Sequence, residues 1–218
     1  MFEKGSAVTM QRDMGTGLDV WPRPELLPSV AELNAQLIEL LVSQAANAAG
    51  PWPLPGELRP LLANFEPAAR RRVATCPYLL VDAGFSDPQR WLWAHGYAVC
   101  DSQPVMEASI TSMPRGIVLA RQVFAYAWHL ARSQRKVARV ILGMSQATAD
   151  VISNYTLVQT MGLADVHPHW LQPRWPRHTR MWRDLLEAAA MDDSTILEQA
   201  RLRGVQLLAA EVRSSALP

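Results

Sequence analysis

Apolar residues recur every three or four positions along most of the chain, a spacing that predicts helices with one buried face. The first clear pattern begins at Ser29 and runs to about Ala48, and Glu32 completes a capping box with Ser29. The apolar face of this helix would carry Val30, Leu33, Leu37, Leu40 and Leu41. The alternation of apolar and polar residues that marks half-buried strands is nearly absent. We therefore expect a mostly helical protein of the all-α class.

Caps and prolines mark the starts of further helices. These starts are Glu66-Pro67, Ser86-Asp87-Pro88, Ser145, Thr156, Arg177 and Asp193 or Ser194. The longest helical region would span residues 106–142, with a break near its start, and Cys76–Val81 would be an extended pass over the core. Trp170, Trp175 and Trp182 are expected to act as packing anchors, because large aromatic side chains bury much area where helices meet.

The two halves of the chain also resemble each other. At a shift of ninety residues, Leu61–Phe65 falls on Val151–Tyr155, Phe85 on Trp175, and Arg90-Trp91 on Arg180-Met181; at a shift of 88, Arg115–Leu119 falls on Arg203–Leu207. The identities are few, so chance remains the alternative to a duplication. The length of this repeat is unlike that of a solenoid, whose units stack in larger numbers.

A duplication would divide the chain into two small helical units, residues 28–113 and 114–212, packed as an internal pseudo-dimer. Residues 1–27 would form a flexible N-terminal tail, and residues 213–218 a C-terminal tail. Each unit has fewer than a hundred residues, so it would gain much of its core from the other unit.

The net charge of +1 hides a strong asymmetry along the chain. Residues 1–110 carry 8 Lys and Arg against 12 Asp and Glu, residues 111–183 carry 10 against 2, and residues 184–218 carry 3 against 6. The basic central segment suits an anionic partner, or it is neutralised within the fold by its acidic flanks.

Eight basic residues in this segment are the candidates for contact with DNA or with a protein partner. They are Arg132, Arg135, Lys136, Arg139, Arg174, Arg177, Arg180 and Arg183. Basic side chains can neutralise phosphates and give a salt-dependent affinity for DNA. Against this, a spacing of three residues drifts around a helix, and the sequence pI of 7.9 is low for a dedicated DNA-binding domain.

Motifs for catalysis or for cofactor binding are absent from the sequence. It contains neither a Gly-x-Ser-x-Gly nucleophile turn nor a glycine-rich phosphate loop, so we expect no enzyme, no cofactor and no small-molecule substrate. His167, His169 and His178 could approach a metal, but a fourth ligand is not identified, and local hydrogen bonding is the simpler interpretation. Cys76 and Cys100 cannot form a disulfide framework or a four-ligand zinc site by themselves.

Uninterrupted apolar runs are only a few residues long, far short of the roughly 20 that cross a bilayer. The first residues lack the apolar core of a secretory signal. We therefore expect a cytoplasmic protein that does not bind membranes.

Several motifs in the second half of the chain resemble a known family. They are Leu142-Gly143-Met144-Ser145-Gln146-Ala147, Tyr155-Thr156-Leu157-Val158-Gln159, Leu163-Ala164-Asp165 and Pro173-Arg174-Trp175, followed by Leu197-Glu198-Gln199 and Gly204–Leu208. In this order and spacing they resemble the D subunit of the bacterial flagellar master transcriptional regulator (FlhD). The resemblance covers roughly residues 117–212 and, more faintly, residues 29–125.

The family's small helical protein forms a homodimer within an assembly that contains a second subunit and activates transcription. The resemblance therefore implies a bacterial, helical regulatory protein that acts through protein partners, with DNA contact as a further option. The alternative is a helical adaptor or scaffold of a secretion or motility apparatus without a nucleic-acid role. The chain is about twice the family's length, which suits a fused pair. It has no zinc-binding cysteine cluster like that of the family's second subunit.

Overall fold

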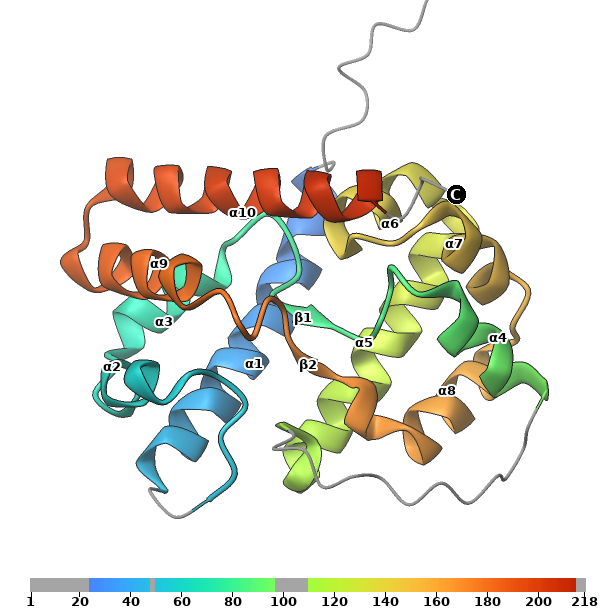
Figure 1. Cartoon of the computed structure of the whole chain (residues 1–218), viewed down its shortest axis with the longest axis horizontal. Helices are drawn as coiled ribbons and strands as arrows, with labels where there is room; N and C mark the ends of the chain where they lie inside the picture. Colours follow the sequence, from blue (N-terminus) through green and yellow to red (C-terminus); the bar gives the residue numbers. More distant parts are fainter. Residues whose placement is uncertain (1–23, 48–49, 97–109, 215–218) are drawn as a thin grey trace, which may run out of the picture.

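Helices make up most of the protein, which confirms the predicted mostly helical fold. The computed structural model describes residues 24–47, 50–96 and 110–214. Its α-helices are α1 (Leu27–Ala46), α2 (Arg59–Ala63), α3 (Pro67–Ala74), α4 (Pro88–Gly96), α5 (Pro114–Ser133), α6 (Arg135–Leu142), α7 (Gln146–Ser153), α8 (Leu157–Val166), α9 (Thr179–Met191) and α10 (Ser194–Ser214) (Figure 1). Short 3-10 helices lie at η1 (Pro24–Leu26), η2 (Gly56–Leu58), η3 (Ile110–Ser112) and η4 (Pro168–Trp170), and two short strands at β1 (Val81–Asp82) and β2 (Gln172–Pro173).

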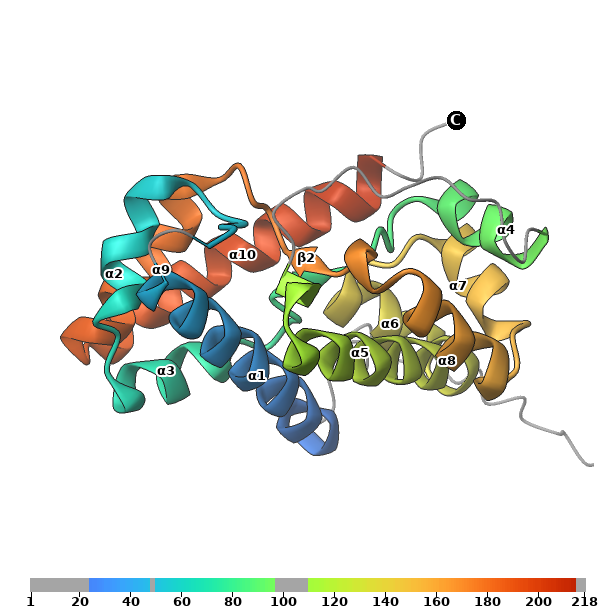
Figure 2. The ribbon, with the colours of Figure 1, turned by 90° about the horizontal axis from the view of Figure 1, so that it is seen from below.

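The long helices α1 and α5 contact each other near the middle of the molecule and point outward in different directions (Figure 2). α1 packs against the short helices α2 and α3, and α5 packs against α7 and α8. Each long helix buries a stripe of apolar side chains, with Leu37 and Leu41 on α1 and Val123 and Phe124 on α5 fully buried. The core therefore continues through both sides of the molecule.

The start of α1 differs from the prediction. The helix begins at Leu27, and no side chain caps it, so the expected capping box of Ser29 and Glu32 is wrong. Pro28 favours the first turn, where its missing N–H costs no hydrogen bond, and this places Ser29 inside the helix. Residues 24–27, expected in the N-terminal tail, are therefore helical.

Other predicted caps are confirmed. Ser145 Oγ accepts a hydrogen bond from the Thr148 N–H, and Thr156 forms a full capping box with Gln159 at the start of α8. Asp193 Oδ1 accepts from the first N–H groups of α10 in the same way. The expected long helix is instead broken at Gln134, where α5 ends, because α6 turns to bury Val137, Ile141 and Leu142. Residues 106–109 of that prediction lie outside the described residues.

β1 and β2 form an antiparallel pair at the centre of the molecule (Figure 1), with Val81 opposite Pro173 and Asp82 opposite Gln172. A turn with a left-handed residue follows each strand, Gly84 (φ 73°) after β1 and Trp175 (φ 51°) after β2. The segment Cys76–Val81, predicted to be extended, thus ends in the short strand β1.

The two turns close with the same hydrogen bond. The Asp87 N–H donates to Gly84 O, and the His178 N–H donates to Trp175 O, each at 3.0 Å. Trp91 and Trp182 follow in α4 and α9, both with no exposed surface, as expected for an anchor at Trp182. Here the matching positions lie 91 residues apart, so the expected match of Arg90-Trp91 with Arg180-Met181 is shifted by one residue. The stretch from the start of α8 to the start of β2 is one residue longer than the stretch from the start of α3 to the start of β1.

Beyond the strands, the chain crosses over. α4 packs against α7, whereas α9 packs against α3 and more lightly against α2. α10 then lies along α9 and reaches α6 on the other side (Figure 1). The helix that follows each strand, α4 after β1 and α9 after β2, thus packs against the other half of the chain.

One segment, Pro24–Ala46, is long and apolar enough, by length and composition alone, to cross a membrane. The sequence prediction missed it because it counted uninterrupted apolar runs, and Glu25, Glu32 and Glu39 interrupt this one. The core helix of a soluble protein passes the same test, and here the apolar face of α1 packs against α2, α3 and α5.

Candidate functional site

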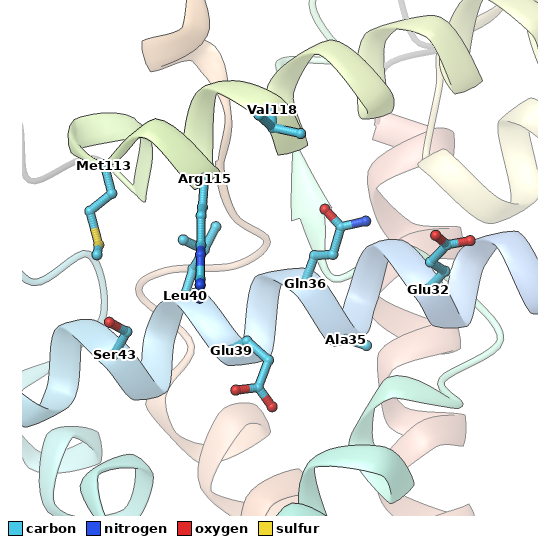
Figure 3. Close-up of a pocket in the computed structure, with 9 residues that line it drawn as sticks. All are labelled: Glu32, Ala35, Gln36, Glu39, Leu40, Ser43, Met113, Arg115 and Val118. Atoms are coloured by element: carbon cyan, nitrogen blue, oxygen red, sulfur yellow. The ribbon is translucent and has the colours of Figure 1, made fainter.

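A groove of about 420 Å³ lies between α1 and the start of α5 (Figure 3). Its walls are Glu32, Ala35, Gln36, Glu39, Leu40 and Ser43 of α1, with Met113, Arg115 and Val118 from the start of α5. Most of the exposed lining is apolar. This volume lies within the range of ordinary ligand and peptide pockets.

The groove exists because α1 has a second face. Its apolar stripe is buried, while Glu32, Gln36, Glu39 and Ser43, spaced by four, three and four residues, line up on another side. From Glu32 to Ser43 this stripe is about 16 Å long, at about 1.5 Å per residue. The sequence carried this signal, but it was not recognised as a site because polar stripes on helices usually face solvent.

Among the residues that the structure describes, only one of the three charged side chains that line the groove forms an ion pair. The Glu39 carboxylate accepts a hydrogen bond from Arg70 Nη1 on α3 at 2.9 Å and points away from α5 (Figure 3). Arg115 extends from α5 toward α1 beside Leu40 (Figure 3). Within residues 24–47, 50–96 and 110–214, neither Arg115 nor Glu32 forms an ion pair. The groove therefore has one uncompensated cation and one uncompensated carboxylate.

Four of the eight predicted basic residues lie at the end of α5 and on α6. Arg132 stacks over the Trp128 ring, 5.1 Å from its centroid, and Arg135 pairs with Asp150 at 3.0 Å. Lys136 is exposed, and Arg139 is half-buried. This group keeps a basic surface, although Asp150 neutralises part of it.

The group around α9 is more strongly neutralised. Arg183 pairs with Glu57 at 2.6 Å, and Arg180 lies 3.9 Å from Asp184. Arg177 is exposed and lies in the turn before α9, which begins at Thr179 rather than at the predicted Arg177. Figure 1 places α9 and α6 on opposite sides of the molecule, so the two basic groups do not form one surface.

Arg174 is a correction to the candidate set, because it is buried, with 2% of its side chain exposed. Its guanidinium donates to Leu79 O at 2.9 Å, to Leu142 O at 2.6 Å and to Val81 O at 3.2 Å. Glu211 of α10 accepts from Nη1 at 3.1 Å. These partners occupy its donors, so Arg174 joins β1, α6 and α10 instead of facing a nucleic acid.

Glu211 was not found by the sequence analysis, because a single Glu near the end of a helix has no distinctive pattern. One carboxylate oxygen accepts from Arg174, and the other accepts from Trp175 Nε1 at 2.6 Å. Burial raises the pKa of Glu211 above its ordinary value of 4.5, although the Arg174 charge opposes this shift. Glu211 thus fastens the end of α10 to the centre of the molecule.

The histidine candidates His167 and His169 lie in partly buried surroundings, and the cysteine candidate Cys76 is buried. The rings of His167 and His169 lie 5.7 Å apart, and partial burial lowers the pKa of both. In the described part of the chain, no group of three His, Cys, Asp or Glu residues could hold a metal ion. Burial raises the pKa of the Cys76 thiol to about 12, and Cys100 lies outside the described residues.

Exposed apolar side chains also occur outside the groove. Val158 and Val166 on α8 are 81% and 64% exposed, and Leu202 on α10 is 57% exposed. Scattered apolar residues of this kind are normal on a surface. The groove differs because its apolar walls converge from two helices.

Comparison of the chain with protein-family models, with curated proteins and with solved structures gave no match.

Proposed function

We propose that this chain is a cytoplasmic regulatory protein, built as a fused pseudo-dimer of an FlhD-like unit, that acts through a protein partner. The symmetric pairing of strands β1 and β2 is the observation that carries this proposal. Val81 pairs with Pro173, and Asp82 pairs with Gln172. A half-turn that places β1 on β2, with Val81 on Gln172 and Asp82 on Pro173, turns the first pair into the second.

Every antiparallel pair has a local twofold axis. Here the offset of 91 residues that this axis requires also relates Gly84 to Trp175 and Trp91 to Trp182, as expected at the middle of a symmetric dimer.

The packing of the helices supports the same arrangement. A half-turn about an axis perpendicular to the view of Figure 1, through β1 and β2, brings α1 roughly onto α5 and the region of α2 and α3 onto that of α7 and α8. The turn before α3 and the turn before α8 also match, since Phe65 N–H donates to Leu62 O and Tyr155 N–H donates to Ile152 O. The crossing of α4 and α9 makes each unit incomplete without the other, as in a domain-swapped dimer.

A protein partner fits the surface better than DNA does. DNA recognition needs basic residues gathered on one face. Here Arg174 is buried, Arg135 and Arg183 are paired with carboxylates, and the remaining basic residues lie on separate sides. The groove between α1 and α5 instead offers converging apolar walls, which are typical of a docking surface for protein segments.

The regulatory role is tested by comparing transcripts from cells that lack the chain with those from the same cells supplied with it. A regulator is expected to change a defined set of transcripts. An adaptor of a secretion or motility apparatus would change assembly or movement and leave transcripts unaltered, and that result would replace the present proposal.

Direct DNA contact is tested separately with the purified chain over a salt series. We expect little retention on DNA at physiological salt and no change with Lys136→Glu and Arg139→Glu. Retention that persists at physiological salt and is lost in these variants would assign a DNA-binding role to the basic surface of α6.

A further inference from the structure

We infer that the groove between α1 and α5 binds one amphipathic helix of a partner protein, with a basic and an acidic residue on its rim two turns apart. This inference rests on the proposed function only in assuming that the chain has a protein partner. It adds the chemistry of the segment that binds and the place where it binds.

The walls of the groove select a helix as the occupant. Both walls are helices whose backbone groups are bonded within each helix, so an extended peptide would find no strand edge to pair with. Rows of side chains on a helix instead fit the spaces between rows on its neighbours. The stripe from Glu32 to Ser43 is about three turns long, which suits a short helical segment.

The apolar part of the groove defines the face of that helix. Leu40 is buried in the floor, while Met113 and Val118 stand on the α5 wall, where Val118 is 48% exposed. Apolar residues at positions i, i+3 or i+4, and i+7 of the occupant would cover these side chains. Removing the exposed surface of Met113 and Val118 from water supplies the main driving force for binding.

The charges define its rim. The start of α5 runs opposite to α1, so Met113 lies near Ser43 and Arg115 near Leu40 (Figure 3). Glu32 lies toward the other end, eight residues or about 12 Å before Leu40 on α1. Since Arg70 already compensates Glu39, the two charges to be met are Glu32 and Arg115. A basic residue opposite Glu32 and an acidic residue opposite Arg115 complement both.

A second copy of this chain fits less well. In a symmetric dimer it would present the same concave surface to the groove, and two concave faces do not make close contact. A membrane surface would not complement a carboxylate and a cation that lie at opposite ends of an apolar groove. These two occupants are separate outcomes of the test below.

The test uses three synthetic amphipathic helices of about eighteen residues, long enough for appreciable helicity, that share one apolar face. Their two rim positions, two turns apart, carry Lys and Glu, two Lys or two Glu. Binding of each fluorescently labelled peptide to the full chain is measured by anisotropy. We expect the mixed peptide to bind about 2- to 5-fold more tightly than either of the others, as surface charge pairs allow.

Charge variants of the chain should redirect this preference. Glu32→Lys should favour the peptide with two Glu, Arg115→Glu the peptide with two Lys, and the double variant should favour the mixed peptide again. Gln36→Trp, which fills the groove without changing its charge, should weaken binding of the mixed peptide at least tenfold. Gln206→Trp is the matched control, because Gln206 is exposed on α10 and does not line the groove, and it should bind like the unaltered chain.

Equal affinity for the three peptides, or unchanged binding by folded Gln36→Trp, would overturn the inference. Concentration-dependent dimerisation that only Gln36→Trp abolishes would assign the groove to a second copy and also overturn it. So would binding to anionic lipid vesicles that the same variant abolishes. These measurements do not involve transcripts. The inference about the groove can therefore be wrong while the regulatory role is correct, and the regulatory role can be wrong while the groove binds a helix.

Discussion

Arg174 and Glu211 form an ion pair across the centre of the molecule, with Nη1 and Oε2 3.1 Å apart. Arg174 comes from the segment after β2, and Glu211 lies in the last two turns of α10. The same guanidinium binds carbonyl groups before and within β1 and at the end of α6. One buried arginine thus connects four segments that are distant in sequence.

Replacing this arginine should destabilise the protein strongly. Arg174→Ala leaves three carbonyl acceptors and one carboxylate without their donor, and loss of one partner of a buried pair costs about 3–5 kcal/mol. We expect the low end of this range, because 36% of the Glu211 side chain is exposed. Urea unfolding measures the loss, and Arg180→Ala, at an 89% exposed side chain, should change stability by less than about 0.5 kcal/mol. Equal effects of the two substitutions would contradict the role given to Arg174.

The raised pKa of Glu211 predicts a pH dependence of stability. The folded state holds the proton to a higher pH than the unfolded state does, so this group contributes stability that is present below about pH 4.5. The contribution is lost as pH rises through the folded-state pKa. The difference in unfolding free energy between the unaltered chain and Glu211→Gln should therefore shift with pH above 4.5, in favour of the variant. A difference that is constant with pH would show that Glu211 titrates alike in both states.

Two glycines in helices should respond to alanine in opposite directions. A Cβ atom at Gly204 of α10 would collide with the Tyr78 hydroxyl oxygen, so Gly204→Ala should cost about 1–3 kcal/mol. A Cβ at Gly162 of α8 meets nothing within 4 Å, so Gly162→Ala should stabilise the protein by about 0.5–1 kcal/mol.

Thermal or urea unfolding of both variants checks this pair. Tyr78→Leu, which shortens the side chain beneath Gly204, should reduce the cost of Gly204→Ala when the two are combined. Strictly additive effects would mean that α10 does not lie against Tyr78 as described.

Cys76 should be unreactive in the folded protein. Its thiol is 1% exposed and its pKa is raised to about 12, so thiolate is scarce at neutral pH and reagents cannot reach it. In a Cys100→Ser variant, a chromogenic disulfide reagent should label Cys76 only after urea unfolds the chain. Rapid labelling under native conditions would contradict the burial of this residue beneath α10.

The sequence predicted the helical class and several helix starts, because caps such as Ser145 and Thr156 act locally. It did not predict the start of α1 or the break at Gln134, because packing against distant helices decides both. Arg174 illustrates the limit for sites. Its spacing placed it in a row of arginines, whereas its environment is made by β1, α6 and α10, which adjoin it only in the folded chain. The groove forms where α1 and α5 approach each other. Because these helices are far apart in the sequence, their contact could not be predicted from it.

The most direct test of the central claim is hydrogen exchange after a substitution in α9. Leu186→Ala removes a side chain that is 1% exposed and lines the contact with α2 and α3. If α9 completes the other unit, amide exchange should increase in α2 and α3, more than a hundred residues earlier, while the variant remains folded. Faster amide exchange confined to α5, α7 and α8 would contradict a pseudo-dimer in which α9 packs on the other unit.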